Sequence, residues 1–486
     1  MSTPTMLPED QVAFWAATDV GRVRDHNEDN FLVDRNLGLF AVADGMGGHA
    51  AGEVASTLAV QTLRAYLGAH RDVVELARGL TAESAGLEEA QRRVLSLLED
   101  AVNHASREIW LAAQADESKR GMGTTLSALL LGSHFGYIAH VGDSRIYLLR
   151  MGEVQQLTED HSLVNALIQE GRLKPEDAPK VEFQNAVTRA VGVYEGVEVD
   201  TLVFPVLPGD QFLLASDGLT AYLESRELPA YMSQEDVKTI PPRLIEMANE
   251  RGGKDNITSI VVRIVDVEGV AEERFRELNF RMEALARMPF FRFLGYAELL
   301  KVFVKMETVR VPKGRMIFRE GTPGDDLFLL LGGTVRVHRG DAELARLGPG
   351  EFFGEMALID QAPRSASIST LEDALLLRLD RKTFFQLIRR ENELAKKVLW
   401  NMLQVLSARL RITNRDLAEA REAMATEIPV EAIDPADVFG GPPPVVRAPG
   451  AAPMSTPGRA LGATLSPPAA RPPGTSLPPP VRKPAT

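Results

Sequence analysis

The sequence predicts an α+β protein: a helix-flanked antiparallel β-sandwich, then a β jelly roll with a long C-terminal helix and a disordered Pro-rich tail. Short apolar runs such as FGYIAHVG and SRIYLLR, separated by turn signals, recur through the first half of the chain, which is typical of hairpins. A second series of short strands punctuated by glycine follows. Sixteen of the thirty prolines lie in residues 427–486, and a segment of this composition cannot bury enough apolar surface to fold.

A chain of 486 residues exceeds one ordinary domain. We expect a sandwich domain, a helical connector, a jelly roll, a C-terminal helix and a disordered tail, at residues 8–266, 267–287, 288–382, 383–427 and 428–486. Within the first domain, the 3.6-residue spacing of apolar residues predicts helices over Ala50–Leu67, Leu87–Ala115 and Pro241–Arg251.

The composition excludes several classes of protein. A net charge of −13 argues against nucleic acid as the main partner. No apolar run is long enough to span a membrane, and the N-terminus lacks the basic and apolar regions of a signal peptide, so we expect a cytoplasmic protein without a membrane partner. The absence of cysteine excludes disulfides, thiolate zinc sites and a cysteine nucleophile.

Acidic residues recur at the ends of the apolar strands of the first domain. Each could be a turn or strand cap. If the strand ends share one rim of the sandwich, however, the carboxylates gather there, and they repel one another unless a cation joins them. Oxygen ligands alone select hard ions such as Mg²⁺ or Mn²⁺. The acidic residues concerned are Glu28, Asp29, Asp44, Asp143, Asp217 and Asp255.

Two such ions about 3.5–4 Å apart would share a bridging water, lower its pKa and create a hydroxide nucleophile. Gly45 follows Asp44 and could turn its carbonyl into the site, because it has no side chain. Arg24 lies four residues before Glu28 and could hold phosphoryl oxygens. This chemistry suits the hydrolysis of phosphate esters.

The motifs TDVGRVRDHNEDN, AVADGMGGHAAGE, GMGTTLSALLL, HVGDSRIYLLR, LTEDHSL, AVTRAVG, LLASDGL and GGKDNITSIVV resemble, in order and spacing, those of bacterial metal-dependent serine/threonine protein phosphatases of type 2C. The resemblance implies that Asp44 bridges two metals and that Gly45 binds one through its carbonyl. Asp217 and Asp255 complete the ligands, and Asp143, with Asp217, serves a third, weaker metal. Glu28 and Asp29 act through water or support the ligands, and Arg24 holds the substrate phosphate.

The proton donor for the leaving group is an open question. Eukaryotic members of the resembled family carry a histidine directly after the Asp-Gly pair, where this chain has Met46. His49, His161 or metal-bound water could supply the proton, and either histidine could equally be structural. By the resemblance, the segment between His161 and Thr188 is a variable flap over the cleft.

The stretch FGEMALIDQAPRSAS, residues 353–367, resembles the phosphate-binding cassette of cyclic-nucleotide-binding domains. A short helix over Gly354–Leu358 could offer backbone N–H groups to the cyclic phosphate. Arg364 could pair with its charge, and Glu355 could accept a hydrogen bond from the ribose. Ser365 favours cAMP over cGMP by the resemblance. The expected nucleotide site comprises Gly354, Glu355, Met356, Ala357, Arg364, Ser365 and Ala366.

A long helix is expected from about Arg381 to Glu427, because this stretch contains neither glycine nor proline. One face carries apolar or small residues in alternating steps of four and three, as in a heptad repeat. The stripe could pack on its own domain or form the coiled coil of a homodimer. It consists of Leu399, Leu403, Leu406, Leu410, Thr413, Leu417, Ala420 and Met424.

These observations predict a phosphatase that acts on phosphoserine and phosphothreonine proteins, within a serine/threonine kinase system, under the control of cAMP or cGMP. Two alternatives remain. One is a cyclic-nucleotide sensor whose phosphatase half is a scaffold without activity. The other is a phosphatase dedicated to anti-sigma-factor antagonists.

Overall fold

The computed structural model describes residues 11–47, 50–81, 84–181, 186–234, 236–265, 271–359 and 362–427. His49 and the proline-rich tail lie outside the described residues. The chain divides into two compact units, Met1–Asn414 and Arg415–Thr486. The first unit holds all of the sheets, and the second is described only where it continues the last helix.

Two antiparallel sheets form the N-terminal half of the first unit. One sheet has the order β1-β11-β10-β7-β8, and the other has the order β2-β3-β5-β6-β9, with β4 pairing at the end of β3. The strands are β1 (Val12–Asp19), β2 (Asp29–Asp34), β3 (Leu39–Met46), β4 (Gly123–Thr124), β5 (Leu126–Leu131), β6 (Phe135–Val141), β7 (Arg145–Arg150), β8 (Glu153–Gln156), β9 (Asp200–Pro205), β10 (Gln211–Ala215) and β11 (Ile257–Ile264).

Strand β3 is buried on both faces. Phe40 and Val42 point into the core between the two sheets, whereas Leu39, Ala41 and Ala43 point toward the outer helices. This alternation follows from the two-residue period of a strand. A strand that is apolar on both faces therefore fixes its neighbours on both sides and holds the end of β3 firmly in place.

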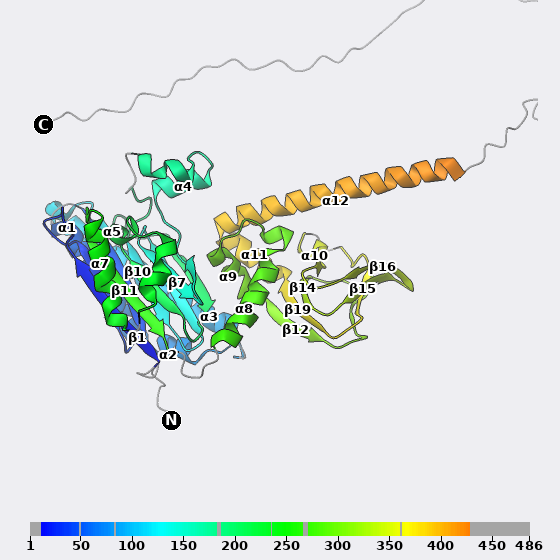
Figure 1. Ribbon diagram of the computed structural model, residues 1–486, viewed down its shortest axis with the longest axis horizontal. Coiled ribbons are helices and arrows are strands. Elements are labelled where there is room, and N and C mark those ends of the chain that lie inside the picture. The colour runs from blue at the N-terminus through cyan, green and yellow to red at the C-terminus, as the bar shows by residue number, and fades with distance from the viewer. Residues whose placement is uncertain are drawn as a thin grey trace, which may run out of the picture. The chain divides into compact units, whose positions relative to one another are not determined.

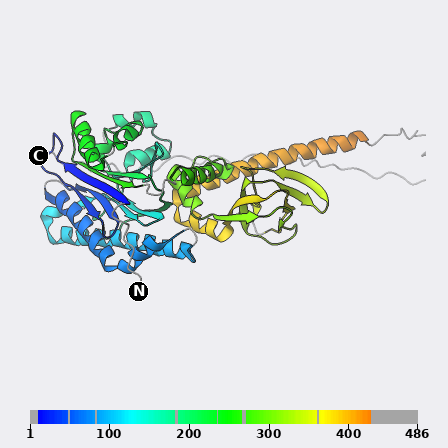
Figure 2. The same cartoon turned by 60° about the horizontal axis from the view of Figure 1, so that its bottom comes forward.

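Helices cover both outer faces of the paired sheets, as predicted for the fold class. In Figure 2 the blue helices of residues 50–115 lie on one side of the sheets and the green helix α7 lies on the other. The helices are α1 (Ala50–Ala69), α2 (Arg71–Gly79), α3 (Leu87–Ala115), η1 (Glu117–Lys119), α4 (Leu163–Gln169), η2 (Pro175–Lys180), α5 (Asp217–Thr220), η3 (Ser225–Glu227), α6 (Leu228–Met232), η4 (Val237–Thr239) and α7 (Ile240–Glu250).

The connector is longer than expected. Helix α8 (Ala271–Ala286) is followed by η5 (Pro289–Phe291) and α9 (Tyr296–Phe303), so the jelly roll, expected from residue 288, begins only at β12, whose first residue is Glu307. Phe290 and Phe291 are buried in the same apolar cluster as α8 and α9. The sequence pattern places these apolar residues in the barrel, whereas in the structure they complete the helical connector.

The jelly roll consists of two four-stranded sheets in the orders β12-β19-β14-β17 and β13-β18-β15-β16. Phe328, Leu330, Val335 and Leu376 belong to the core between them. The strands are β12 (Glu307–Val311), β13 (Met316–Phe318), β14 (Asp326–Gly332), β15 (Val335–Arg339), β16 (Ala342–Leu347), β17 (Phe352–Phe353), β18 (Ser367–Thr370) and β19 (Ala374–Asp380), with α10 (Met356–Ile359) between β17 and β18.

The single C-terminal helix expected from Arg381 is broken in two. Helix α11 (Arg381–Arg390) ends at Glu391, whose φ and ψ are −113° and 85°, and α12 (Asn392–Glu427) follows. Glu391 caps α11 through its backbone N–H and its carbonyl accepts the first bond of α12, from Ala395. Its carboxylate also pairs with Lys301. These tertiary contacts override the helical propensity of the stretch.

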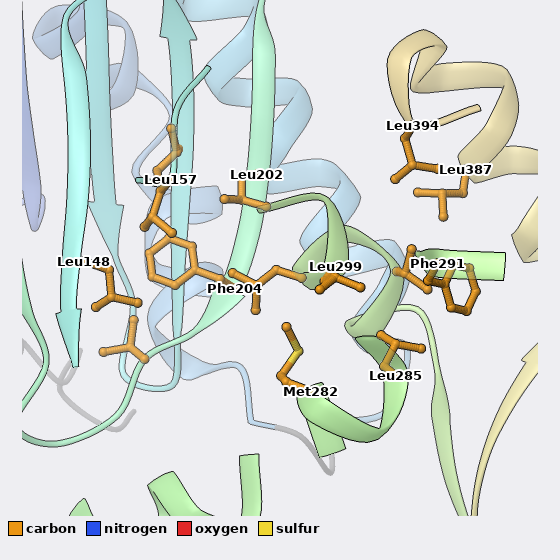
Figure 3. Packing of buried hydrophobic residues seen from close by; sticks show 14 of the residues in the cluster. Leu148, Leu157, Leu202, Phe204, Met282, Leu285, Phe291, Leu299, Leu387 and Leu394 are labelled. Carbon is orange, nitrogen blue, oxygen red and sulfur yellow. The ribbon is translucent and has the colours of Figure 1, made fainter. Parts of the chain in front are cut away.

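One apolar cluster runs from the sandwich core through the connector to the jelly roll. It includes Phe204 of β9, Leu299 of α9 and Leu387 of α11, and Figure 3 shows these side chains in succession. Residues of β9, α9 and α11, which Figure 1 shows along the chain, therefore belong to one apolar cluster of the first unit. None of the helices in the described part of the chain is long and apolar enough to cross a membrane.

Candidate active site

The strand ends of the sandwich meet at a cavity of about 410 Å³. Six residues singled out in the sequence line it together with Gly45, although they come from five separate segments of the chain. These six are Arg24, Glu28, Asp44, Asp143, Asp217 and Asp255. Asp29 is not among the lining residues; it is buried and pairs with Asp44 across β2 and β3.

Asp44 is held at the end of β3 by two threonines. Its backbone N–H donates to the hydroxyl of Thr125 (2.9 Å), and its carbonyl accepts from the backbone N–H of Thr125 (2.8 Å) and the hydroxyl of Thr124 (2.9 Å). The backbone around Asp44 is therefore saturated with hydrogen bonds. Its carboxylate is left to face the cavity.

Gly45 is required by packing. A Cβ atom at this position would lie 2.2 Å from the carbonyl oxygen of Gly52 and 2.5 Å from that of Glu28. Both obstacles are backbone atoms, so no side chain could be accommodated without moving β3 away from α1. The glycine lets the strand that carries Asp44 pass close to both segments.

Asn256 joins the loop of Glu28 to the start of β11. Its side-chain oxygen accepts from the backbone N–H of Glu28 (2.8 Å), and its amide donates to the carbonyls of Val20 and His26 (3.0 and 2.8 Å). Because Asn256 directly follows Asp255, these bonds fix two of the acidic residues relative to each other.

Burial and mutual repulsion dominate the electrostatics of the site. Burial, followed by the charges of Asp29, Asp217 and Asp143, raises the pKa of Asp44. Burial and the neighbouring acids likewise raise the pKa of Asp143 to about 7, and burial raises that of Asp29 to about 7. The carboxylates are thus held close together in a place that disfavours their charge unless a cation compensates it.

Several oxygens at this site lack hydrogen-bond partners. Glu28 Oε1, Asp29 Oδ1 and Asp217 Oδ1 are buried and make no hydrogen bond, which is costly for a carboxylate. In the part of the chain that the structure describes, no group of three or more acidic or histidine side chains is arranged so that it could hold a metal ion. The donor set is nevertheless all oxygen and acidic, which fits hard divalent cations.

Arg24 supplies the positive charge that the structure shows at this site. Its guanidinium donates to Asp255 (2.7 Å), and its side chain remains half exposed. The hydrogen bond to Asp255 is the largest cause of the raised pKa of Arg24. The residue expected to hold phosphate therefore pairs with an expected metal ligand.

The described histidines differ sharply in their positions. His161 is buried, and its Nδ1 accepts from the backbone N–H of Gly142 (3.1 Å). It does not line the cavity, so its position favours the structural alternative. Met46 and His26 do line the cavity, and His26 was not considered from the sequence.

The supporting residues Thr125, Asn256 and Ser216 were also missed. Each is next to a residue or strand that was predicted: Thr125 directly precedes β5, Asn256 follows Asp255, and Ser216 precedes Asp217. Ser216 donates to the carboxylate of Asp29 (2.7 Å). Small polar residues beside the acids are the signal that could have identified them.

A second candidate site lies in the jelly roll around Arg364. This side chain is buried, its guanidinium donates to the carbonyls of Asp326 and Gly354 (3.0 and 3.3 Å), and it stacks 4.1 Å above the ring of Phe318. Its Nε is buried without a hydrogen-bond partner. Burial lowers the pKa of Arg364, so the cation is poised to gain from an anionic partner.

Among the predicted residues of this site, Arg364 contacts Gly354. Gly354 has φ +80°, and a Cβ atom there would lie 2.5 Å from the carbonyl of Asp326 and 2.8 Å from Arg364 Nη1. Glu355 is buried beside it. Met356 begins the short helix α10, which includes Ala357. Ser365 and Ala366 follow Arg364 just before β18.

Comparison with known proteins gives two family matches. Residues 22–258 match the family model described as protein phosphatase 2C, and residues 308–391 match the model described as cyclic nucleotide-binding domain. The first match contains all of the acidic residues of the cavity, and the second contains Gly354, Glu355 and Arg364.

Relatives of known activity resemble the first half of the chain. The chain is 41% identical over 249 residues to the serine/threonine phosphatase stp of Listeria innocua, covering 50% of this chain and 93% of that protein. It is 36% identical over 250 residues to the protein phosphatase PhpP of Streptococcus pneumoniae, covering 50% and 94%. The solved structure of the serine/threonine phosphatase PstP of Mycobacterium tuberculosis is 34% identical with a TM-score of 0.46, covering 52% of this chain and 99% of that one.

Proposed function

The chain belongs to the protein phosphatase 2C family of serine/threonine phosphatases and carries a C-terminal cyclic nucleotide-binding domain, and we infer that it hydrolyses phosphoserine and phosphothreonine in proteins with divalent cations under the control of a cyclic nucleotide. The observation that carries the first part is the convergence of Asp44, Asp143, Asp217, Asp255 and Glu28 on one cavity.

Asp44, Asp217 and Asp255 are the residues that would hold two Mg²⁺ or Mn²⁺ ions, with the carbonyl of Gly45. Asp143 would contribute to a third ion. Bound divalent cations would supply a lowered pKa for a nucleophilic water and charge stabilisation for the phosphoryl oxygens. The unpartnered oxygens of Glu28 and Asp217 support this assignment.

Arg24 would bind and orient the phosphoryl group. Its guanidinium lies at the mouth of the cavity, half exposed, and its planar donors match phosphate oxygens. A cation beside Asp255 would compete with Arg24 for that carboxylate. Arg24 would then be released toward the substrate at the moment when the site is complete.

In the jelly roll, Arg364 would pair with the cyclic phosphate and Glu355 would accept a hydrogen bond from the ribose. The unpartnered Nε of Arg364 supports an anionic ligand. Ser365 beside the arginine favours cAMP over cGMP by the family resemblance. The continuous core between the two domains would carry a change in the jelly roll to the phosphatase.

We propose a homodimer formed through the heptad stripe of α12. Leu399, Leu403, Leu410 and Leu417 are 48%, 62%, 62% and 49% exposed. A different face of the same helix, with Leu394, Val398 and Met402, is buried against the rest of the first unit. The stripe is therefore left for a second copy of the chain.

The experiment that tests this function is hydrolysis of p-nitrophenyl phosphate and of a phosphothreonine peptide by the full chain, with Mn²⁺ or with EDTA, and with or without cAMP. The expected result is Mn²⁺-dependent turnover of both substrates and a change of rate on addition of cAMP. Binding of cAMP without any metal-dependent turnover would identify the chain as a sensor with a scaffold domain.

A further inference from the structure

The segment Glu159–Leu163 contacts the turn that precedes Asp143 of the phosphatase cavity. Its Glu159 is also subject to the charge of Lys397, in the part of the first unit from residue 271 to residue 414, which we call the nucleotide-binding half. On the cavity side, the backbone N–H of His161 donates to the carbonyl of Gly142 (2.8 Å), and the N–H of Gly142 donates back to His161 Nδ1 (3.1 Å). Gly142 directly precedes Asp143.

The other side of Asp143 is held by the same segment. Arg145 donates to both carboxylate oxygens of Asp160, with Nε–Oδ1 at 2.9 Å and Nη2–Oδ2 at 2.7 Å. Gly142 and Arg145, the residues on either side of Asp143 and Ser144, are thus held by His161 and Asp160. A shift of this segment must move Asp143.

The segment also holds a second wall of the cavity. The N–H of Leu163 donates to the carbonyl of Ala186 (2.8 Å), the N–H of Thr188 donates to that of His161 (2.7 Å), and Ser162 forms a β-bridge with Val187. Val187 lines the cavity. The segment therefore controls Asp143 on one side and Val187 on the other.

The turn at Gly142 is closely packed against Thr125. Gly142 has φ +110°, and a Cβ atom there would lie 2.5 Å from Cγ2 of Thr125. The hydroxyl of Thr125 accepts from the backbone N–H of Asp44. Displacement of this turn would consequently press on the residue that supports Asp44.

The segment also contacts Asp200 of β9, and charges of α9 and α12 act on Asp200 or on Glu159. His161 Nε2 lies 3.1 Å from Oδ2 of Asp200. Asp200 Oδ1 also accepts from Arg189 Nη1 (2.7 Å). Lys301 lines the same cavity as Asp200. Although burial would raise the pKa of Asp200, the charges of His161, Lys301 and Arg189 lower it. Lys301 of α9 in turn pairs with Glu391 (2.5 Å), the residue at which α11 and α12 are broken.

Space for movement exists at this junction. Asp200, Lys301 and Glu391 line one cavity of about 590 Å³ between α3 and β9 on one side and α9 and α11 on the other. Close by, burial raises the pKa of Glu159 and the positive charge of Lys397 in α12 opposes that shift. Lys397 of α12 thus acts electrostatically on the segment, and Lys301, the partner of Glu391, acts on Asp200.

We propose that Glu159–Leu163 is the positioning element through which the nucleotide-binding half controls the phosphatase, by way of the chain Glu391–Lys301–Asp200–His161–Gly142. The proposal rests on the nucleotide control inferred above and specifies its route. A change in the angle between α11 and α12 would move Glu391, redistribute Lys301 between Glu391 and Asp200, and shift the Asp143 and Val187 walls of the cavity.

The test compares Lys301→Gln with Lys305→Gln in the full chain. Lys305 lines the same junction cavity and pairs with Glu88 (3.2 Å), but it is not part of the chain to His161. With Mn²⁺ and a phosphothreonine peptide, the wild-type kcat/KM should change by about 5- to 150-fold on saturation with cAMP. Lys301→Gln should reduce that factor to below ~2-fold while its basal rate and its cAMP binding persist, and Lys305→Gln should keep the wild-type factor.

Hydrogen exchange provides a second readout that does not depend on turnover. Addition of cAMP to the wild-type chain should alter exchange at the amides of Gly142, His161, Leu163 and Thr188, and Lys301→Gln should abolish this change. An equal cAMP response in Lys301→Gln, or an exchange change confined to other segments, would overturn the route and leave the phosphatase function intact. If the wild type binds cAMP with no change of rate and no change of exchange at these four amides, both nucleotide control and the route are overturned. Absence of metal-dependent turnover alone would contradict only the enzymatic function.

Discussion

Nη2 of Arg24 lies 2.7 Å from Oδ2 of Asp255, in a cavity that also holds the carboxylates of Asp44 and Asp217. An arginine between clustered acids offsets part of the charge that divalent cations would neutralise. The same guanidinium is the group placed to bind a substrate phosphate. Its two partners, carboxylate and phosphate, cannot be bound by the same donors at once.

Arg24→Ala should therefore lower kcat/KM for a phosphothreonine peptide by roughly 10²- to 10³-fold, the cost of removing one preorganised donor from a transition state. The Mn²⁺ concentration for half-maximal activity should fall or stay level, because a competitor for Asp255 is gone. Arg22→Ala, on the same loop but outside the cavity lining, serves as the control. A large rise in the Mn²⁺ requirement of Arg24→Ala would contradict this assignment.

Asp44→Asn and Asp217→Asn should each reduce turnover by more than the ~10- to 100-fold typical of losing a residue that only supports a metal ligand. Desolvation and repulsion by neighbouring acids raise the pKa of both carboxylates, so their neutralisation should leave thermal stability without Mn²⁺ unchanged or higher. Calorimetry of Mn²⁺ binding and circular dichroism separate these effects.

Asp34→Asn is the matched control for these variants. Asp34 is also buried at the end of β2, but it pairs with Arg64 (2.7 Å) outside the cavity. This variant should lose stability and keep its Mn²⁺-dependent turnover. Near-normal turnover in Asp44→Asn would contradict the two-metal site.

Arg364→Ala should weaken cAMP binding at least ~30-fold, about 2 kcal/mol, because a phosphate in the cassette would lose its charged partner. Arg346→Ala is the control: Arg346 is exposed on β16 of the same barrel and pairs with Glu343. Titration calorimetry with cAMP and with cGMP measures both affinity and preference. Equal affinities in wild type and Arg364→Ala would show that the ligand binds elsewhere.

Stability should fall as pH falls through the titration of His140. Burial, followed by the charge of His161, lowers the pKa of His140 to about 4, whereas an unfolded histidine titrates near ~6.5. The folded state thus binds fewer protons than the unfolded state between these values. The contribution of His140, about 3 kcal/mol at most, is present above pH ~6.5 and lost progressively toward pH ~4.

The measurement is urea unfolding of wild type and His140→Gln at pH 7.5 and pH 5. The difference in free energy of unfolding between the two chains should shrink at pH 5, because the variant lacks this proton linkage. Other acids titrate in both chains alike, so the comparison isolates His140. A difference that does not depend on pH would show that the imidazole is not held neutral by the fold.

The sequence allowed prediction of the acidic site because strand ends on one rim must meet, and Asp44, Asp143, Asp217 and Asp255 do line one cavity. It did not indicate that Arg24 pairs with Asp255, since this contact joins residues 231 positions apart that both had other expected partners. The local composition likewise did not predict the helix break at Glu391. At that break Glu391 pairs with Lys301, a contact that arises only when α9 and α11 pack together.

The heptad stripe of α12 gives the final prediction. The double substitution of Leu406 and Leu410 by Glu should convert a dimer into a monomer in light scattering at micromolar concentration, because burying two charges in an apolar seam costs several kcal/mol. Leu344→Glu, at a position 55% exposed on β16, is the matched control and should leave the dimer intact. Basal turnover of p-nitrophenyl phosphate should persist in both variants, since the cavity draws all of its lining from residues 23–255. If wild type is monomeric at these concentrations, the exposed stripe does not pair with a second copy.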